Sequence, residues 1–242
     1  MDVVALGELL IDFTENGISS QGTPLFEANP GADMMLTEEE IPEELILETR
    51  IFHFGTLSMT HEKVRRATKK AVAIAKQAGA IISFDPNIRE PLWNSMDEAR
   101  EQVLYGLGQC HILKISDNEI QWLTGKNDYT EAVKWIREKY DIPLILVSMG
   151  KEGSRAYYQD RMVEKAPFIN ENTIETTGAG DTFCACVLHY ICKHGLENLT
   201  EKNLKEMLTY ANAAASIITT RKGALRVMPR PEEIEALIAG YH

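Results

Sequence analysis

Short apolar runs alternate with longer amphipathic segments through residues 50–150, and this alternation constrains the fold more than any other feature of the sequence. The runs have the length of buried strands, and the segments between them are long enough for helices. The pattern is typical of a mainly parallel sheet with helices on both faces, which makes a three-layer α/β/α sandwich. We expect strands at 50–58, 80–84, 111–116 and 143–150, and helices near 60–79, 95–108, 117–125 and 130–141.

The flanking regions extend this prediction to one domain over residues 1–242. Residues 3–14 (VVALGELLIDFT) are apolar enough for one buried strand, 154–167 read as a hairpin, and 181–239 are mostly helical. Within 60–79 the apolar residues recur at helical spacing, and Gly79 supplies a stop. The apolar positions of that helix are Val64, Ala67, Ala71, Ile74 and Ala78.

Composition argues against several classes of protein. A chain of 242 residues with 44% hydrophobic residues can bury one sizeable core. Its net charge is −11 and no basic stripe appears, which argues against nucleic acid and anionic membranes as partners. The N-terminus MDVVALGELLIDF lacks the cationic flank and long apolar region of a signal peptide. No run of about 18 apolar residues predicts a transmembrane helix.

The four cysteines suit neither a zinc site nor a disulfide framework. Three of them fall on one apolar segment, where their spacing matches neither kind of site. We expect buried, reduced thiols and therefore a cytoplasmic protein. The cysteines are Cys110, Cys184, Cys186 and Cys192.

Residues 176–181 (TTGAGD) place small residues before a lone carboxylate and an apolar, helix-like run. A helix that starts there offers unpaired N–H groups and a partial positive charge, and Gly and Ala let a phosphate approach closely. Beside a bound phosphate, Asp181 can accept the proton of an attacking hydroxyl. The alternative is that Asp181 only caps a helix and the glycines only form a turn. The segment is not a Walker A loop, because no GxxxxGK[ST] motif is present.

The segment ETTGAGDTFCACV (175–187) resembles the second signature of the ribokinase-like (PfkB) carbohydrate kinases. Other segments agree with that family in order and spacing, and FDPNIREPLW is similar to its fructokinase branch. The joint order is far more specific than any single segment. The further segments are VVALGELLIDFT (3–14), FDPNIREPLW (84–93), LKISDNEIQWLTG (113–125), VSMGKEGS (147–154) and YANAAASIITTRKGALRVMP (210–229).

The resemblance implies roles for individual residues. Asp181 would be the catalytic base, and Gly178, Ala179 and Gly180 would form the anion hole for the transferring phosphoryl group. Glu119 would help to place Mg²⁺ through its water shell, which suits an ion that dehydrates reluctantly. Substrate would be bound by Asp12, Gly31 and Arg89, and nucleotide by Lys114, Ser148, Gly150, Gly153, Asn212, Gly223 and Ala224.

Each role has a plainer alternative. Arg89 could form a surface ion pair, Glu119 could be a solvated helix acid, and Asn212 could be an ordinary polar helix residue. The ordered set of motifs weighs against these alternatives. The chain departs from the family at Glu175, where aspartate is common. That position helps to form a monovalent-cation site in some relatives, so the resemblance leaves K⁺ activation open.

The chain is shorter than the family pattern near residues 29–36. There Asn29-Pro30-Gly31 runs straight into Ala32-Asp33-Met34-Met35-Leu36, without the family's second glycine, its substrate-binding asparagine and its lid strands. We therefore expect an internal truncation, with the lid and part of the N-terminal substrate half absent and an exposed loop at the junction. Thr37 and Glu40 form an adequate capping box for the next helix. Loss of a lid would weaken sugar binding and favours a monomer over a lid-mediated dimer.

The expected function is ATP-dependent phosphorylation of a sugar. D-Fructose, converted to fructose 6-phosphate with Mg²⁺ and ATP, is the first choice because the discriminating segments look most like the fructokinase branch. Ribose and 2-keto-3-deoxygluconate are the alternative sugars. The competing interpretation is a non-catalytic nucleotide-binding remnant, which keeps the elements of 113–229 but has lost sugar turnover.

Overall fold

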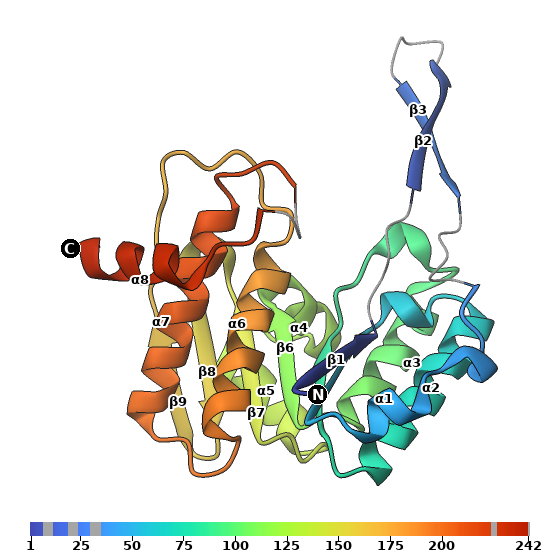
Figure 1. The fold of residues 1–242 in the computed structure, drawn as a ribbon, viewed down its shortest axis with the longest axis horizontal. Helices are drawn as coiled ribbons and strands as arrows, with labels where there is room; N and C mark the ends of the chain where they lie inside the picture. Colours follow the sequence, from blue (N-terminus) through green and yellow to red (C-terminus); the bar gives the residue numbers. More distant parts are fainter. Residues whose placement is uncertain (7–11, 19–23, 30–34, 224–226, 242) are drawn as a thin grey trace. The chain divides into compact units, whose positions relative to one another are not determined.

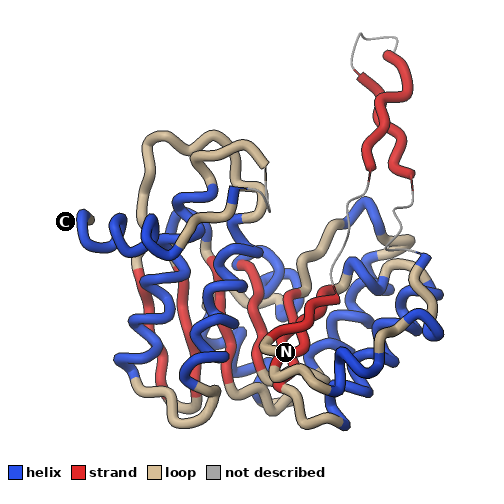
Figure 2. Tube along the Cα trace, in the orientation of Figure 1, coloured by secondary structure: helices blue, strands red, loops and turns tan. Residues whose placement is uncertain are grey.

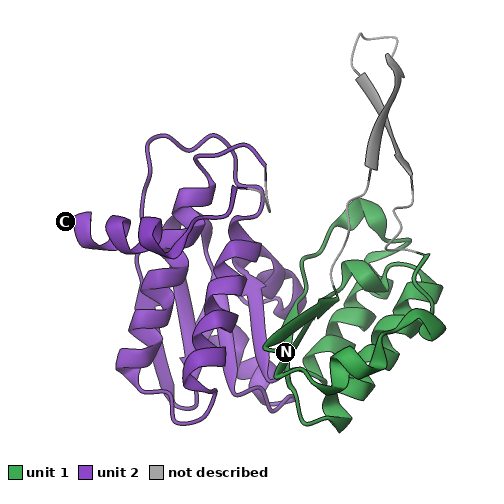
Figure 3. Cartoon of the chain, viewed as in Figure 1, with its two compact units in different colours: residues 1–110 green, residues 111–242 purple. Residues whose placement is uncertain are grey.

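The computed structural model describes residues 1–242 except 7–11, 19–23, 30–34, 224–226 and 242 (Figure 1). Seven strands form a mostly parallel sheet in the order β1-β4-β5-β6-β7-β8-β9, and β2 and β3 form a separate antiparallel pair (Figure 2). The chain divides into two compact units, residues 1–110 and 111–242 (Figure 3). The predicted α/β fold with a mainly parallel sheet is confirmed.

The first unit contains parallel strands joined by helices. In register, Val3 of β1 pairs with Ile51 of β4, and Ile51 pairs with Ile81 of β5. Short 3₁₀ turns lie at Glu38–Glu40, Leu57–Met59 and Glu90–Leu92. The strands are β1 (Val3–Leu6), β2 (Asp12–Ile18), β3 (Pro24–Asn29), β4 (Ile51–Gly55) and β5 (Ile81–Asp85), and the helices are α1 (Glu43–Leu47), α2 (Glu62–Gln77) and α3 (Met96–Leu107).

Phenylalanines fill the core of this unit. Phe52, Phe54 and Phe84 are fully buried, and the ring centroids of Phe54 and Phe84 are 4.8 Å apart. Helix α3 packs over Phe84 through Gly106, where an added Cβ would lie 2.3 Å from the Phe84 ring. Glycine at position 106 therefore lets α3 approach the sheet closely.

The second unit completes the sheet and carries the helical C-terminal third. Antiparallel strands β8 and β9 follow β7, as the hairpin prediction requires. A 3₁₀ turn lies at Gly150–Glu152. The strands are β6 (Ile112–Ser116), β7 (Leu144–Ser148), β8 (Ser154–Tyr158) and β9 (Arg161–Lys165), and the helices are α4 (Asp117–Thr124), α5 (Tyr129–Arg137), α6 (Ala179–His194), α7 (Glu201–Ile218) and α8 (Pro231–Gly240).

Helices cover both faces of the strands in the second unit. Figure 1 shows α6 and α7 across the near face of these strands and α4 and α5 behind them. The sequence explains this arrangement, because Leu144–Val147 of β7 are four consecutive apolar residues that are all fully buried. A strand buried on both faces reads as a continuous apolar run, and such a strand needs a helix layer on each side.

Most of the predicted elements are confirmed, with two corrections. Helix α2 buries Val64, Ala67 and Ala71 and ends before Gly79, whose φ of +75° supplies the left-handed stop. Ala78 is exposed, because it is the C-cap and lies beyond the buried face. The single strand predicted at 3–14 is wrong, since β1 ends at Leu6 and β2 begins at Asp12.

The second correction has a clear physical reason. A continuous apolar pattern does not distinguish one long strand from two strands in different sheets, because both have the same alternation. The pair β2–β3 was therefore not expected from the sequence. In that pair Asp12 is opposite Asn29. The predicted junction at 29–36 lies mostly outside the described residues.

The capping box predicted at Thr37 and Glu40 is confirmed, because the Thr37 N–H donates to Glu40 Oε2 at 2.9 Å. The element that it starts is a 3₁₀ turn and not a longer helix. Among the helices that the structure describes, none has the length and apolar character needed to cross a bilayer.

None of the four cysteines forms a disulfide, and the prediction that they are buried is confirmed for two of them. Cys110 and Cys184 are buried, whereas Cys186 and Cys192 are half-buried. Burial raises the pKa of the Cys110 thiol well above its usual value and raises the pKa of Cys186 to about 11. Cys110 and Cys186 therefore stay protonated at neutral pH.

Candidate active site

Helix α6 begins at Ala179, and its N-cap is Gly178 and not Asp181. Gly178 has a φ of +76°, a left-handed conformation that glycine adopts at little steric cost. The Thr182 N–H donates to the Gly178 carbonyl at 2.8 Å and so opens the helical ladder. Asp181 lies in the first turn with an exposed side chain. Asp181 is therefore not the residue that caps α6.

The residues predicted to form an anion hole differ in what their N–H groups do. The Ala179 N–H donates to the Thr176 carbonyl at 3.1 Å, so it is already used within the protein. Gly180 and Asp181 lie in the first turn, where an N–H group has no acceptor within its own helix. The helix start adds a partial positive charge. An anion at this turn would therefore bind chiefly to the Gly180 and Asp181 N–H groups.

A buried lysine lies against the same turn. Lys114, in the middle of β6, is 6% exposed. Its Nζ is 3.1 Å from the position that a Cβ on Gly180 would occupy. This contact places the first turn of α6 beside β6, two residues before the strand ends at Ser116. The glycine turn thus lies near the carboxyl end of a parallel strand, where ligands of open α/β sheets bind.

Serines form a row across the strands of this unit. Ser116 at the end of β6 is in register with Ser148 at the end of β7, and Ser148 is in register with Ser154 at the start of β8. The row continues to Lys165 at the end of β9. Ser148 was predicted to bind nucleotide, and it is half-buried within this row. The row marks the edge from which helix α4, with Glu119, and the turn with Gly150 begin.

Asn212 of α7 is held by bonds within the protein. Its Oδ1 accepts from Ser154 Oγ at 2.8 Å, and its Nδ2 donates to the carbonyls of Lys165 at 3.2 Å and Ala166 at 3.1 Å. The side chain is 7% exposed. Both N–H bonds of the amide therefore serve to join α7 to the β8–β9 hairpin, which is a structural role.

The two glycines of the turn after β7 face different surroundings. Gly153 has a φ of +97°, and a Cβ added there would lie 2.1 Å from the Lys165 carbonyl oxygen. Gly150 has a φ of +52°, and a Cβ there would meet nothing within 4 Å. Gly153 is therefore required by packing, whereas the space beside Gly150 is open.

Glu119 forms a capping box at the start of α4. Its Oε2 accepts from the Ser116 N–H at 2.9 Å and from Ser116 Oγ at 2.8 Å. Within the described ranges, no group of three or more His, Cys, Asp or Glu side chains could hold a metal ion. The described residues therefore do not form a Mg²⁺ site made of protein ligands alone. A Mg²⁺ ion that is bound to ATP phosphates and contacts Glu119 through water would fit this surface.

Glu175 joins two loops. Its Oε1 accepts from the Gly223 N–H at 2.8 Å, and the N–H groups of Ile174 and Glu175 both donate to the Thr219 carbonyl. The segment before α6 is thereby tied to the loop after α7. Gly223, predicted to bind nucleotide, is thus placed through Glu175, while its neighbour Ala224 lies outside the described residues.

The family described as pfkB family carbohydrate kinase matches residues 17–231. The chain belongs to this family. Fructokinase-1 from Zea mays is 39% identical over 214 residues, which are 88% of this chain and 66% of that protein. Fructokinase-2 from Solanum habrochaites is 36% identical over 216 residues, which are 89% of this chain and 66% of that protein. The chain thus spans just under two thirds of the length of these curated relatives.

Solved structures agree with the family. Fructokinase from Vibrio cholerae O395, in a fructose, ADP and calcium ion bound form, has a TM-score of 0.78 and 26% identity, over 94% of this chain and 71% of that chain. A double mutant of the same enzyme, bound to fructose, ADP and potassium ion, matches equally well. Fructokinase with bound ATP from Xylella fastidiosa has a TM-score of 0.80 and 24% identity, over 92% of this chain and 72% of that chain. At that identity the last likeness shows the fold alone.

The residues predicted to bind sugar in this pfkB-family chain belong to the first unit. Arg89 is exposed on the segment after β5, and its Nη1 donates to the Ile88 carbonyl at 3.1 Å. Asp12 begins β2, and Gly31 lies outside the described residues. Among the predicted site residues of the second unit, the structure brings Lys114 against Gly180.

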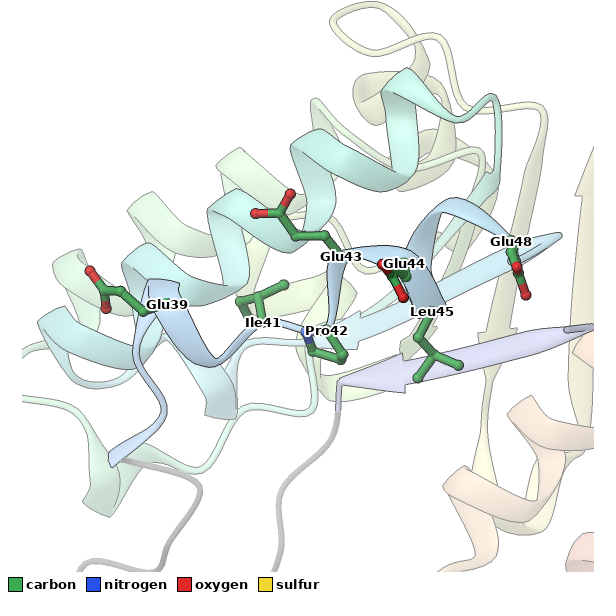
Figure 4. A pocket seen from close by; sticks show the side chains of 7 residues that line it. All are labelled: Glu39, Ile41, Pro42, Glu43, Glu44, Leu45 and Glu48. Atoms are coloured by element: carbon green, nitrogen blue, oxygen red, sulfur yellow. The ribbon is translucent and has the colours of Figure 1, made fainter.

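Two cavities in the described part of this pfkB-family chain are lined by none of the predicted site residues. One of about 640 Å³ is lined by acidic side chains of and around α1, and none of the predicted site residues lines it. Its carboxylates diverge, as Figure 4 shows, and Glu43 is paired with Lys70 at 2.6 Å. A second, of about 710 Å³, has Arg221 and Arg230 at its wall.

Sequence reasoning missed two polar residues of the second unit. Ser154 completes the serine row and holds Asn212, but strand register cannot be read from sequence. Thr182 is 3% exposed, and its hydroxyl has no hydrogen-bond partner among the described residues. The one signal for Thr182 was its place directly after Asp181 in the first turn of α6.

Proposed function

We propose that this chain is a sugar kinase that transfers the γ-phosphoryl group of ATP to D-fructose and gives fructose 6-phosphate. The observation that carries the proposal is the first turn of α6. There Asp181 is exposed and is not the helix cap, and Lys114 lies beside Gly180. Membership of a carbohydrate kinase family supports phosphoryl transfer to an alcohol as the reaction class.

The geometry supports a direct in-line transfer. Asp181 would accept the proton of the primary sugar hydroxyl while the hydroxyl oxygen forms a bond to the γ-phosphorus. The bond between the γ-phosphorus and the β–γ bridging oxygen breaks, and its electron pair leaves with ADP. Since Asp181 is exposed, it can pass the proton to solvent afterwards. The N–H groups of Gly180 and Asp181 would hold the phosphoryl oxygens.

Three other groups belong to this proposal. Mg²⁺ bound to ATP supplies charge neutralisation at the phosphates, and Glu119 would orient its water shell. The third group is K⁺, which would bind near Glu175, whose Oε1 accepts from the Gly223 N–H. A direct comparison of turnover in potassium and choline salts would test this site.

D-Fructose is the proposed sugar because the relatives from Zea mays and Solanum habrochaites are fructokinases. Asp12, Gly31 and Arg89 are the residues proposed to bind it. A panel of fructose, ribose, tagatose and 2-keto-3-deoxygluconate tests the choice. A much higher kcat/KM for ribose or the keto acid would refute fructose while leaving the kinase assignment in place.

A second candidate function is supported by the length of the chain. The chain spans 66% of the fructokinase from Zea mays, so some residues that bind sugar in a full-length enzyme would be absent here. A nucleotide-binding protein without sugar turnover would keep the second unit intact. Titration calorimetry with ATP–Mg and then with fructose separates the candidates, because the remnant binds only the nucleotide.

The substitution Asp181→Asn tests the catalytic proposal. It keeps the size of the side chain and removes its basicity, so turnover should fall by about 10²- to 10⁴-fold. Affinity for ATP–Mg should stay nearly unchanged. Asp160→Asn, at an exposed acid in the β8–β9 turn, is the matched control and should keep full activity. Full turnover in the Asp181→Asn variant would end the base assignment.

A further inference from the structure

We infer that the edge of β1 that faces away from β4 is a docking site for an extended segment of another protein, with lysine or arginine at every second position. The segment would add a strand to the sheet and place its basic side chains at the acidic cavity beside α1. This inference goes beyond the proposed function and does not depend on sugar turnover.

Strand β1 has backbone groups that point away from its neighbour. It comes first in the order of the seven-stranded sheet, and β4 is its one strand partner among the described residues. The Ile51 N–H donates to the Asp2 carbonyl at 3.0 Å. Since alternate residues of a strand in a parallel pair bond to the same neighbour, Asp2 and Val4 face β4. The N–H and C=O groups of Val3 and Ala5 therefore face the other way, where they form a template for an added strand.

The side chains of β1 are poorly buried for their composition. All four residues of the strand (VVAL, 3–6) are apolar, which is typical of a strand that is covered on both faces. In the neighbouring β4, Phe52 and Phe54 are fully buried. In contrast, Ala5 is exposed and the other residues of β1 are half-buried. A segment that lies along this edge would bury them further, and this burial would favour binding.

The cavity of about 640 Å³ beside α1 adjoins the start of this strand (Figure 4). The amino group of Met1 donates to the carbonyl of Glu48, which is one of the residues that line the cavity. Leu45 contributes an apolar wall and is 37% exposed. The side chains of Glu44 and Glu48 are exposed and form no ion pair within the part of the chain that the structure describes. The cavity therefore offers free negative charge beside the open edge.

The position of the cavity determines the pattern of the partner. Helix α1 packs against α2, and α2 packs against β4 and β5, so α1 and its cavity belong to one face of the sheet. Successive side chains of an added strand point to opposite faces, so every second one would lie on the face of the cavity. A lysine or arginine there would pack its methylene groups against Leu45 and reach Glu44 or Glu48 with its charge.

Charge argues against a second copy of this chain as the occupant. The net charge of the chain is −11, and a second copy would bring its own acidic cavity to the same interface. Like charges that meet across an interface oppose binding. A basic segment of another protein is therefore the occupant that this surface favours.

The principal test is a titration of the full chain with the peptide acetyl-VKVKV-amide, with hydrogen exchange of single amides followed by NMR. Exchange of the Val3 and Ala5 N–H groups should become slower in the complex, whereas Val4, which already bonds to β4, should not change. The matched control is acetyl-VEVEV-amide, which should bind at least about 10-fold more weakly because its charges repel Glu44 and Glu48. Unchanged exchange at Val3 and Ala5 would overturn the inference.

Ala5→Pro tests the edge itself. Proline removes the N–H that points outward and places its ring in the path of an added strand, while the bonds from β1 to β4 remain. Affinity for acetyl-VKVKV-amide should fall by at least about 10-fold, and the melting temperature should be retained. Ala5→Ser keeps the N–H and is the control, with unchanged affinity. If Ala5→Pro bound the peptide as tightly as the wild type, the edge would not be the docking site.

A double variant, Glu44→Gln with Glu48→Gln, keeps the test decisive if the proline variant fails to fold. Both side chains are exposed, so the double variant should fold normally. It should bind acetyl-VKVKV-amide several-fold more weakly and lose its preference over the acidic peptide. Glu171→Gln, at an exposed acid of the second unit, is the control and should leave both affinities unchanged. A preference that survives in the double variant would refute a basic partner.

Sedimentation of the chain without peptide tests the choice of occupant. Wild type and Ala5→Pro should both sediment as monomers. A wild-type dimer that becomes a monomer in Ala5→Pro would show that a second copy covers this edge, and this result would overturn the inference. None of these measurements uses ATP or sugar, so their outcome is independent of whether the proposed kinase activity is found.

Discussion

The two glycine-containing turns of the second unit use glycine for different reasons. In the turn after β7, Gly153 has a backbone conformation that other residues rarely adopt, and the Lys165 carbonyl fills the space beside it. In the turn before α6, Gly180 has no such conformation, and its neighbour is the ammonium of Lys114. One glycine is required by the fold, and we propose that the other is required by a ligand.

The comparison matters because both turns look alike in sequence. The family resemblance assigns Gly153 to the nucleotide and Gly180 to the anion hole, yet only geometry separates a glycine that packing demands from one that leaves room for chemistry. Variants of the first kind should lose stability, whereas variants of the second kind should lose affinity or turnover. The predictions below test this division.

The largest effect on stability should come from Gly153→Ala. The new Cβ would lie 2.1 Å from the backbone oxygen of Lys165, and the φ of +97° strains any residue with a side chain. We expect a loss of about 3 kcal/mol or more in the free energy of unfolding, measured by urea denaturation. A loss of less than about 1 kcal/mol would place Gly153 with the ligand-facing glycines.

Asn212→Ala should have the next largest effect. It leaves the Ser154 hydroxyl and the carbonyls of Lys165 and Ala166 without their partner. The expected cost is about 1–3 kcal/mol of unfolding free energy, with ATP–Mg affinity largely retained. Calorimetry on the folded variant checks the affinity, and a large affinity loss at full stability would return Asn212 to the nucleotide site.

Ser154→Ala provides the matched control for that experiment. It removes one of the Asn212 contacts and leaves the other two. In a double-mutant cycle with Asn212→Ala the two costs should not add, because they share one hydrogen bond. Additive costs would show that the hydrogen bond at 2.8 Å contributes nothing to stability.

Much of the fold could be predicted from sequence because β4 to β9 are read from local patterns. Strand and helix periods alternate there, and short turns with Gly, Asn and Asp separate them. The N-terminal segment 3–14 could not be read in this way. Its apolar pattern continues past Leu6, and only the pairing of Asp12 with Asn29 shows that a second sheet begins.

In the candidate site, as in the fold, the sequence predicts local features but not contacts between residues that are far apart in the chain. The sequence indicates a helix start within 176–181 and a carboxylate at Asp181, because both belong to one short segment. The approach of Lys114 to Gly180 joins residues far apart in the chain, and it depends on how α6 crosses β6. The bonds of Asn212 depend on strand register in the same way, so its contacts with the β8–β9 hairpin could not be read from the sequence.

A smaller effect is expected for Gly150→Ala. Its φ of +52° costs a residue with a Cβ about 1 kcal/mol, although no atom lies within 4 Å of the new Cβ. Gly79→Ala is the matched control, since Gly79 has a φ of +75°, open space and no place in the proposed site. Both variants should lose similar stability, but only Gly150→Ala should weaken ATP–Mg binding in calorimetry. Equal affinities would remove Gly150 from the nucleotide site.

The smallest effect at neutral pH concerns Cys186, a half-buried residue of α6. Burial raises the pKa of Cys186 from 9.0 to about 11. Between these values the unfolded chain has lost the thiol proton while the folded chain keeps it, so unfolding releases a proton and stability falls as pH rises. The stabilising contribution is therefore fully present below about pH 9 and is lost as pH approaches 11.

Cys186→Ala tests this prediction through the pH dependence of its cost. The difference in unfolding free energy between wild type and Cys186→Ala should shrink from about pH 8 to about pH 11, because only the wild type carries this thiol. Cys110 is buried in both proteins, so its own contribution cancels. Val187→Ala, at the next buried position of α6, removes apolar packing without an ionisable group, and its cost should not follow pH in this way. A difference for Cys186→Ala that stays constant across this range would show that the thiol is solvated in the folded chain, which would extend the exposed surface of α6 beyond its first turn.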